Sequence, residues 1–188
     1  MKPPFKFQNM FSPFYWLALF VLSALYFCSG CDNKPLVKIG DKSPGISGTD
    51  THGEIFSLDQ LKGKVGVIFF WTNSCCGDRV KMLEPFYRQN RGKGLEVLAV
   101  NVGDTKEIVE SYTKANELTF TLLTDEHSKI SKQYGIFGFP TIFILDKNGI
   151  IREKIHGDIP TDKLQKLVVK QFNIQKEIET NYENIHPR

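Results

Sequence analysis

The sequence lacks the features that mark several large classes of protein. Its 188 residues carry a formal net charge of only +3 and contain no run dense in lysine and arginine, so we expect no nucleic-acid partner. Neither an internal repeat nor a low-complexity tract is present. The length suits one ordinary domain with an appendage at either end.

Cysteines are few, and their spacing is unusual. The chain has four of them, Cys28, Cys31, Cys75 and Cys76, whereas an exported domain held by structural disulfides shows several spaced pairs. The first two lie in a targeting segment, which leaves the adjacent pair Cys75–Cys76 for the domain. We therefore interpret this pair as chemical rather than structural.

The N-terminus is typical of an export signal. A short positive region precedes an apolar run at positions 14–27, which is shorter than the ~20 residues of a membrane-spanning helix and suits a signal-peptide core. Two small residues then lead to Cys31, which resembles the lipid-carrying cysteine of bacterial lipoproteins, although Cys28 stands where those signals usually carry leucine. An uncleaved anchor is the alternative. In both cases we expect an exported, membrane-anchored protein that faces the periplasm or another extracytoplasmic space.

The remaining chain is expected to form one α/β domain. We predict a signal or anchor at 1–31, a tether at 32–40, the domain at 41–173 and a polar C-terminal extension at 174–188. Apolar patterning and turn residues predict a hairpin within 43–63, strands at 65–71, 95–102, 120–124, 141–145 and 150–155, and helices from 79, at 104–116, at 126–134 and from 161, with a kink at Pro85. This order predicts a mixed central sheet with helices on both faces.

The first chemical motif lies between the buried strand at 65–71 and the helix after it. It runs from Trp71 to Asp78 as WTNSCCGD and places Cys75 in the turn that opens the helix. Unpaired backbone N–H groups and the helix dipole stabilise a thiolate there, which lowers the pKa of the thiol. Because the thiolate is the attacking species in disulfide exchange, Cys75 is the candidate nucleophile.

The second motif, YGIFGFPT at 134–141, runs straight into a strand. A proline in such a position, here Pro140, can form a rigid cis turn. Together with the segments LKGKVGVIFFW and GLEVLAVNVGDTKE, the two motifs make residues 40–172 resemble the ResA/TlpA-type thioredoxin family, which consists of membrane-tethered extracytoplasmic thiol–disulfide oxidoreductases.

This resemblance implies a thioredoxin-like fold with an N-terminal hairpin and an inserted helix–strand unit near 104–124. It also implies that Pro140 is cis and lies against the attacking Cys75, with Phe139, Thr141, Trp71 and Gly77 flanking the site. Members of the family act in cytochrome c maturation or in other exported thiol reduction. Exported protein thiols and disulfides are therefore the expected partners.

The chain departs from the family pattern at the redox centre itself. The family centre reads Trp-Cys-x-x-Cys, whereas this chain has Ser74 at the Trp position, Cys75 at the first Cys and Asp78 at the second. Phe69 replaces a polar residue of the buried strand, and Lys81 replaces an acid. The attacking thiol is thus retained, and the resolving thiol is lost.

Two effects of these replacements oppose each other. The Asp78 carboxylate raises the pKa of the nearby Cys75 thiol, and Lys81 offsets this effect. The direction of the net shift in the pKa of Cys75 therefore stays open. Cys76 is the remaining partner for Cys75, and a disulfide between adjacent residues closes a small ring. We favour an unreactive, partly exposed Cys76 and keep the vicinal disulfide as an alternative.

Other functions have weaker support in the sequence. Thr72-x-x-Cys75 resembles part of a peroxiredoxin centre, but Ile68 stands where the upstream proline belongs. Thiolates select copper(I) or zinc, but none of the histidines His52, His127 and His156 lies at a usual ligand spacing, so we predict no metal and no cofactor. We expect a monomeric single-cysteine thiol–disulfide exchange protein, with a redox-inactive binding or assembly module as the rival.

Overall fold

The computed structural model describes residues 36–186, so the predicted signal segment, the lipidation candidate Cys31 and residues 32–35 of the predicted tether lie outside the described residues. None of the helices within 36–186 has both the length and the apolar character needed to cross a bilayer. In chain order the elements are β1 Ser47–Thr49, β2 Ile55–Ser57, the 3-10 helix η1 Leu58–Leu61, β3 Val65–Trp71, α2 Asn73–Lys81, α3 Glu84–Asn90, the 3-10 helix η2 Arg91–Lys93, β4 Leu95–Val102, α4 Lys106–Ala115, β5 Thr121–Asp125, α5 Lys129–Gln133, β6 Thr141–Leu145, β7 Ile151–His156 and α6 Thr161–Ile185.

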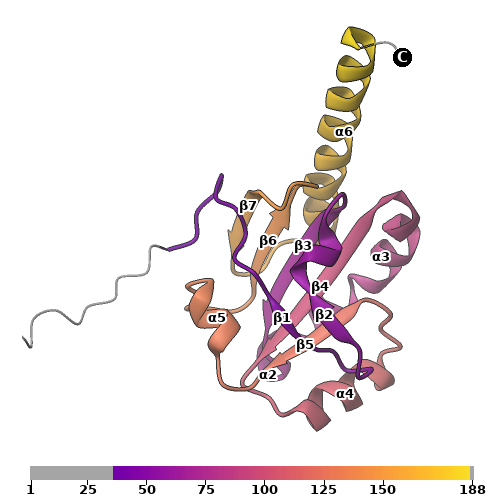
Figure 1. Cartoon of the computed structure of the whole chain (residues 1–188). Coiled ribbons are helices and arrows are strands. Elements are labelled where there is room, and N and C mark those ends of the chain that lie inside the picture. Colours follow the sequence, from indigo (N-terminus) through magenta and orange to yellow (C-terminus); the bar gives the residue numbers. More distant parts are fainter. Residues whose placement is uncertain (1–35, 187–188) are drawn as a thin grey trace, which may run out of the picture. The chain divides into compact units, whose positions relative to one another are not determined.

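A five-stranded mixed sheet forms the centre of the domain (Figure 1), with the strand order β5-β4-β3-β6-β7. β3 is parallel to β4, and β4 is parallel to β5, whereas β6 runs antiparallel to both β3 and β7. All seven residues of β3 are buried, which explains why its sequence is a continuous apolar run rather than an alternating one. The predicted mixed sheet is confirmed.

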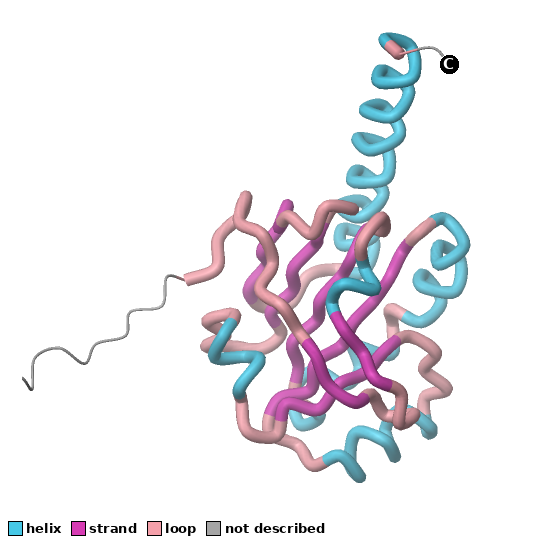
Figure 2. The backbone as a smooth tube through the Cα atoms, viewed as in Figure 1, coloured by secondary structure: helices cyan, strands magenta, loops and turns pink. Residues whose placement is uncertain are grey.

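The two faces of the sheet are covered differently (Figure 2). On one face, side chains of α2, α3, α4 and α6 pack with alternate residues of β3, such as Phe69 and Trp71. On the other face, the hairpin β1–β2, η1 and the α5 region cover Ile68 and Phe70. Helices therefore lie on both faces, and the N-terminal hairpin and the α4–β5 insertion both occur where the resemblance implied them.

The redox helix differs from its prediction in extent. α2 begins at Asn73 and ends at Lys81, and a separate helix, α3, begins at Glu84. Pro85 lies in the first turn of α3, where a missing N–H removes no helical hydrogen bond. The expected kink at Pro85 is thus a break between two helices, and both cysteines lie inside α2 rather than in a loop before it.

The last helix, α6, extends well beyond the part of it that packs on the core. α6 has 25 residues and runs without interruption through the segment that begins at residue 174. Its first half packs Leu164 and Val168 into the core, and its second half rises away from the sheet (Figure 1). An ion pair between Lys147 and Glu179 attaches this second half to the turn between β6 and β7.

Candidate redox site

The two cysteines occupy the first turns of α2, directly after the central strand β3. Thr72 is the N-cap residue, and its carbonyl oxygen accepts from the backbone N–H of Cys76 at 3.1 Å. Cys75 is exposed, whereas Cys76 is only 2% exposed. A disulfide joins the two residues. The expected partial exposure of Cys76 is therefore wrong, because the turn of α2 directs its side chain into the core, and the structure has the vicinal disulfide that was the alternative.

A loop from the far end of the chain lies against Cys75. The Cys75 sulfur is 4.0 Å from the carbonyl oxygen of Phe139, and the Phe139–Pro140 peptide bond is cis, as the resemblance implied. Thr141 holds this loop, since its hydroxyl donates to the carbonyl oxygen of Gly138 at 2.7 Å. The structure thus brings Phe139 and Pro140 beside Cys75, and Thr141 anchors the loop that carries them.

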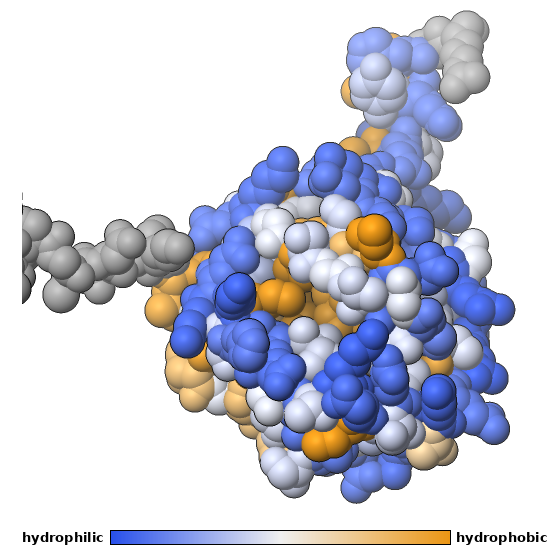
Figure 3. Space-filling model, turned by 60° about the horizontal axis from the view of Figure 1, so that its bottom comes forward, coloured by the Kyte–Doolittle hydropathy of each residue, from blue (hydrophilic) through white to orange (hydrophobic). Residues whose placement is uncertain are grey.

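An open groove of about 600 Å³ runs between the cysteines and this loop. Its lining combines both sulfur-bearing residues, three apolar residues and three charged residues: Cys75, Cys76, Met82, Phe139, Pro140, Asp78, Arg79 and Asp158. Figure 3 turns the end of the domain that carries α2 and α4 toward the viewer, and there apolar side chains form separate patches among hydrophilic ones. Charged groups therefore reach the redox groove.

The start of α2 is held by a residue that the sequence did not single out. Asp104 accepts the backbone N–H of Asn73 at 2.9 Å and the side-chain amide of Asn101 at 2.8 Å, both through Oδ2. Thr105 occupies the N-cap position of α4, but its side chain makes no capping hydrogen bond. The Asp104 carboxylate therefore supports the start of α2.

A tyrosine behind α2 fixes the position of the helix. The Tyr112 hydroxyl donates to the carbonyl oxygen of Gly77, and the Tyr112 ring lies 4.8 Å from that of Trp71 between centroids. A Cβ on Gly77 would meet the Tyr112 ring at 3.2 Å, so glycine permits this approach. Burial raises the pKa of Tyr112 to about 12. Trp71 is fully buried, and its Nε1 has no partner among the described residues. The Trp71 side chain packs in the core under α2 and does not line the groove.

Two ion pairs flank the cysteines. The Lys81 ammonium lies 2.6 Å from Asp78 Oδ1, and its hydrogen bond and charge hold the pKa of Asp78 below the usual value. The second pair joins Arg79 to Asp158, in the loop between β7 and α6. Lys81 is therefore paired with Asp78. The Arg79–Asp158 pair was missed, since nothing in the sequence links positions so far apart.

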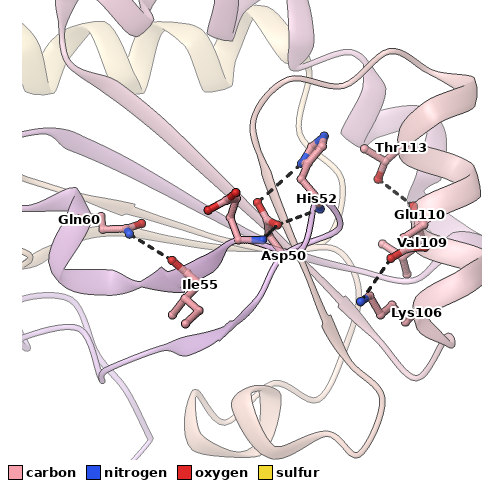
Figure 4. A network of polar contacts seen from close by, with 9 residues as sticks. Asp50, His52, Ile55, Gln60, Lys106, Val109, Glu110 and Thr113 are labelled. Carbon is pink, nitrogen blue, oxygen red and sulfur yellow. Dashed lines mark hydrogen bonds and ion pairs between the residues drawn. The ribbon is translucent and has the colours of Figure 1, made fainter.

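The remaining candidates do not assemble at this site. His52 belongs to the β1–β2 turn, where its backbone N–H donates to Asp50 Oδ1 at 2.8 Å and its ring lies 3.6 Å from Asp50 Oδ2 (Figure 4). His156 stacks on Phe137 beside the proline loop. Within 36–186, no group of three or more His, Cys, Asp and Glu side chains could hold a metal ion. In the Thr72-x-x-Cys75 motif, the Thr72 hydroxyl lies 3.4 Å from the hydroxyl of the exposed Ser74.

Comparison with known proteins agrees with this geometry. The sequence profile of the AhpC/TSA family matches residues 39–154, and a thiol–disulfide oxidoreductase ResA from Bacillus cereus is 30% identical over 135 residues, which cover 71% of this chain and 78% of that relative. The chain belongs to the AhpC/TSA family and, within it, to the ResA-like thiol–disulfide oxidoreductases. A thiol–disulfide oxidoreductase ResA from Geobacillus kaustophilus is also 30% identical to this chain over 135 residues, which cover 71% of this chain and 78% of that relative.

Solved structures support the same fold for this ResA-like chain. The thioredoxin domain of a thiol-disulfide oxidoreductase from Bacteroides vulgatus superposes with a TM-score of 0.61 and 25% identity, and the match covers 70% of this chain and 99% of that domain. A secreted Mycobacterium tuberculosis disulfide oxidoreductase, described as homologous to DsbE, has a TM-score of 0.60 and 21% identity over 66% of this chain and 95% of its own. The thioredoxin-like fold and the family resemblance are confirmed.

Proposed function

We propose that this chain exchanges disulfides with exported proteins, that Cys75 is the attacking thiol and that Cys76 takes over the resolving role lost at position 78. The observation that carries the proposal is the disulfide between Cys75 and Cys76 at the start of α2, beside the Pro140 loop. This arrangement offers an accessible sulfur, a second sulfur within bonding reach and a groove for a substrate.

The exchange proceeds in two substitutions at sulfur. The Cys75 thiolate attacks a substrate disulfide R–S–S–R′, a Cys75–S–S–R bond forms, and R′S⁻ leaves and takes up a proton. The Cys76 thiolate then attacks the Cys75 sulfur, the Cys75–Cys76 disulfide forms, and RS⁻ leaves. The substrate gains two electrons and the protein loses two. A dithiol donor reverses both steps and restores the reduced protein.

The difference in exposure assigns the two roles. Cys75 is exposed and borders the groove, so a bulky protein disulfide can reach its sulfur. Cys76 is 2% exposed, which prevents attack on an external disulfide and leaves an intramolecular step. Attack by the incoming donor thiolate is likewise directed at the Cys75 sulfur.

The loop before Pro140 is the proposed docking site for the substrate. Its Phe139 carbonyl faces Cys75, and Thr141 fixes the loop through Gly138. An extended substrate peptide that pairs with the loop backbone would bring its own sulfur to Cys75, while Met82 and Phe139 offer apolar contact. Exported thiols, including those handled in cytochrome c maturation, are the proposed substrate class.

The proposed location rests on the N-terminal sequence. The apolar run at 14–27 and Cys31 favour export followed by lipidation or anchoring. A membrane-held monomer would present its redox groove to the extracytoplasmic space.

A second candidate function is a redox-inactive binding or assembly module. It is favoured by one observation, the replacement of the resolving cysteine by Asp78, whose carboxylate is engaged by Lys81. Such a module would keep the groove beside Pro140 and would not depend on either sulfur.

Thiol exchange with oxidised glutathione separates the two functions. The full-length protein in detergent is reduced, treated with oxidised glutathione and digested, and Cys75 and Cys76 are followed by mass spectrometry. Wild type should end as the Cys75–Cys76 disulfide, and Cys76→Ser should accumulate glutathione on Cys75. Cys75→Ser should form neither product. An unchanged exchange rate in Cys75→Ser would exclude the proposed mechanism, and Ser74→Ala serves as the matched control at the neighbouring exposed position.

A further inference from the structure

An arginine shares the redox groove with the two cysteines. Arg79 lies in α2, and Asp158 reaches it from the loop between β7 and α6, 79 residues further along the chain. Both residues line the same groove as the two sulfurs. The pair therefore places a cation and an anion, held by different elements, beside the reacting atoms.

Arg79 and Cys75 lie on the same face of α2, because they are four residues apart in the helix. Both side chains line the groove beside the Pro140 loop. One guanidinium nitrogen, Nη2, is held by Asp158, and the other, Nη1, lies 3.9 Å from the Met82 sulfur.

We propose that Arg79 is a positioning residue that supplies the counter-charge for the Cys75 thiolate, and that Asp158 sets how much of this charge the thiolate receives. The inference rests on the proposed function and adds a residue pair to it. In the oxidised protein the disulfide is neutral and Arg79 is paired with Asp158 alone. Reduction and loss of a proton place a second anion in the groove, so the guanidinium then shares the groove with two negative groups.

The other charges near Cys75 are already engaged. Asp78 and Lys81 pair with each other at 2.6 Å, so their fields at Cys75 partly cancel. Asp104 is engaged at the start of the helix, where it accepts the N–H of Asn73 and the side-chain amide of Asn101. The His156 ring stacks on Phe137 and lies within hydrogen-bond distance of the Thr141 hydroxyl.

Arg79 is thus the cation of α2 whose partner comes from outside the helix. The pair is also partly solvated, with side-chain exposures of 41% for Arg79 and 52% for Asp158. Water screens such a pair and keeps its coupling to the thiolate moderate. A moderate coupling suits a group that adjusts the reactivity of Cys75 without fixing it in one protonation state.

The pH dependence of Cys75 alkylation tests this inference. The reduced full-length protein is treated with iodoacetamide from pH 5 to 10, and the label on Cys75 is read by peptide mass spectrometry. We expect Arg79→Gln to slow labelling at pH 7 by about two- to five-fold and Asp158→Asn to accelerate it by a similar factor, which corresponds to opposite pKa changes of roughly 0.3–0.7 units. The rates should converge at high pH, where Cys75 is fully ionised in every variant.

Two further variants separate charge from structure. Arg79→Lys keeps the positive charge and should label at close to the wild-type rate. Asp59→Asn removes a carboxylate on η1 from its exposed ion pair with Lys62, and it should leave the profile unchanged. Profiles that shift in the same direction for Arg79→Gln and Asp158→Asn, or that do not shift, would overturn the inference. Because labelling requires no disulfide exchange, this result is distinguishable from a failure of the proposed function.

Discussion

The sulfur of Cys75 lies 4.0 Å from the carbonyl oxygen of Phe139, although 64 residues separate them along the chain. In the reduced protein this oxygen can accept a hydrogen bond from the Cys75 thiol, which favours the neutral form. The N-terminus of α2 favours the thiolate instead. The reactivity of Cys75 therefore depends on a balance between a loop carbonyl and a helix end, and nearby charges shift that balance.

Asp78 is the first of these charges to test. Lys81 holds the pKa of Asp78 below its usual value, so the carboxylate is ionised at neutral pH and opposes a thiolate at Cys75. Asp78→Asn should raise the rate of Cys75 alkylation at pH 7 by about two- to five-fold, because the variant also releases Lys81 from its partner. Stopped-flow alkylation across pH measures the effect.

The matched variant at this pair is Lys81→Gln, which should slow the same reaction. In acid the difference between wild type and Asp78→Asn should disappear as pH falls through the lowered pKa of Asp78, because the wild-type carboxyl becomes neutral there. Equal rates for wild type and Asp78→Asn at pH 7 would show that Lys81 already cancels the charge at Cys75.

Asp78→Cys tests whether the family spacing can be rebuilt. The variant places a second thiol three residues after Cys75, on the same side of α2. In a Cys76→Ser background we expect the introduced thiol to release a substrate from the mixed disulfide and to form a new disulfide with Cys75, detected by peptide mapping. If the mixed disulfide persists as long as in Cys76→Ser alone, a thiol at position 78 cannot reach Cys75 in this chain.

Sequence patterning predicted the strands well because their burial is nearly complete. β3 and β6 occur where the runs VGVIFFW and TIFIL lie, and both are buried at every position. The start of α2 was placed too late, because TNSCCGD is rich in residues typical of loops and poor in strong helix formers. Asp104, from the loop after β4, supplies the hydrogen bond at the helix start that these residues lack.

Residues of the site could be predicted from the sequence only where a single local motif contained them. Cys75 and Pro140 stood out because each lies at a junction with a buried strand. Tyr112, Asp104 and Asp158 did not, because each reaches α2 across at least 31 residues of sequence. A tyrosine on an amphipathic helix or an aspartate after a strand has many ordinary uses, and only the fold shows which one applies.

Asp104 should therefore contribute to stability as well as to geometry. Asp104→Ala removes the acceptor for the Asn73 N–H, and it also leaves the amide of the fully buried Asn101 without its partner. We expect a loss of about 1–2 kcal/mol in the free energy of unfolding, the usual cost of losing an N-terminal cap. Urea unfolding followed by circular dichroism measures it, and Asp104→Asn, which keeps an oxygen acceptor, should lose less. A loss no larger for Ala than for Asn would contradict a capping role.

Tyr112 makes the fold sensitive to alkali. Burial raises the pKa of Tyr112 from its ordinary 10.0 to about 12, so folding favours the neutral phenol. Its contribution to stability is fully present below pH 10, and it is lost as the pH rises toward 12, because the unfolded chain ionises first. The melting temperature of wild type should therefore fall more steeply over this interval than that of Tyr112→Phe.

The comparison between variants isolates this residue. Burial also raises the pKa of Tyr134, but Tyr134 is present in both proteins, so its effect cancels in the difference. Tyr112→Phe should be less stable than wild type at pH 7, because the Gly77 carbonyl loses its donor, and the two melting curves should approach each other as the pH rises. The control Tyr182→Phe removes an exposed phenol on α6 and should follow wild type at every pH. Parallel curves for wild type and Tyr112→Phe from pH 9 to 12 would mean that the phenol ionises equally readily in the folded and unfolded chains, and that burial against Trp71 does not control it.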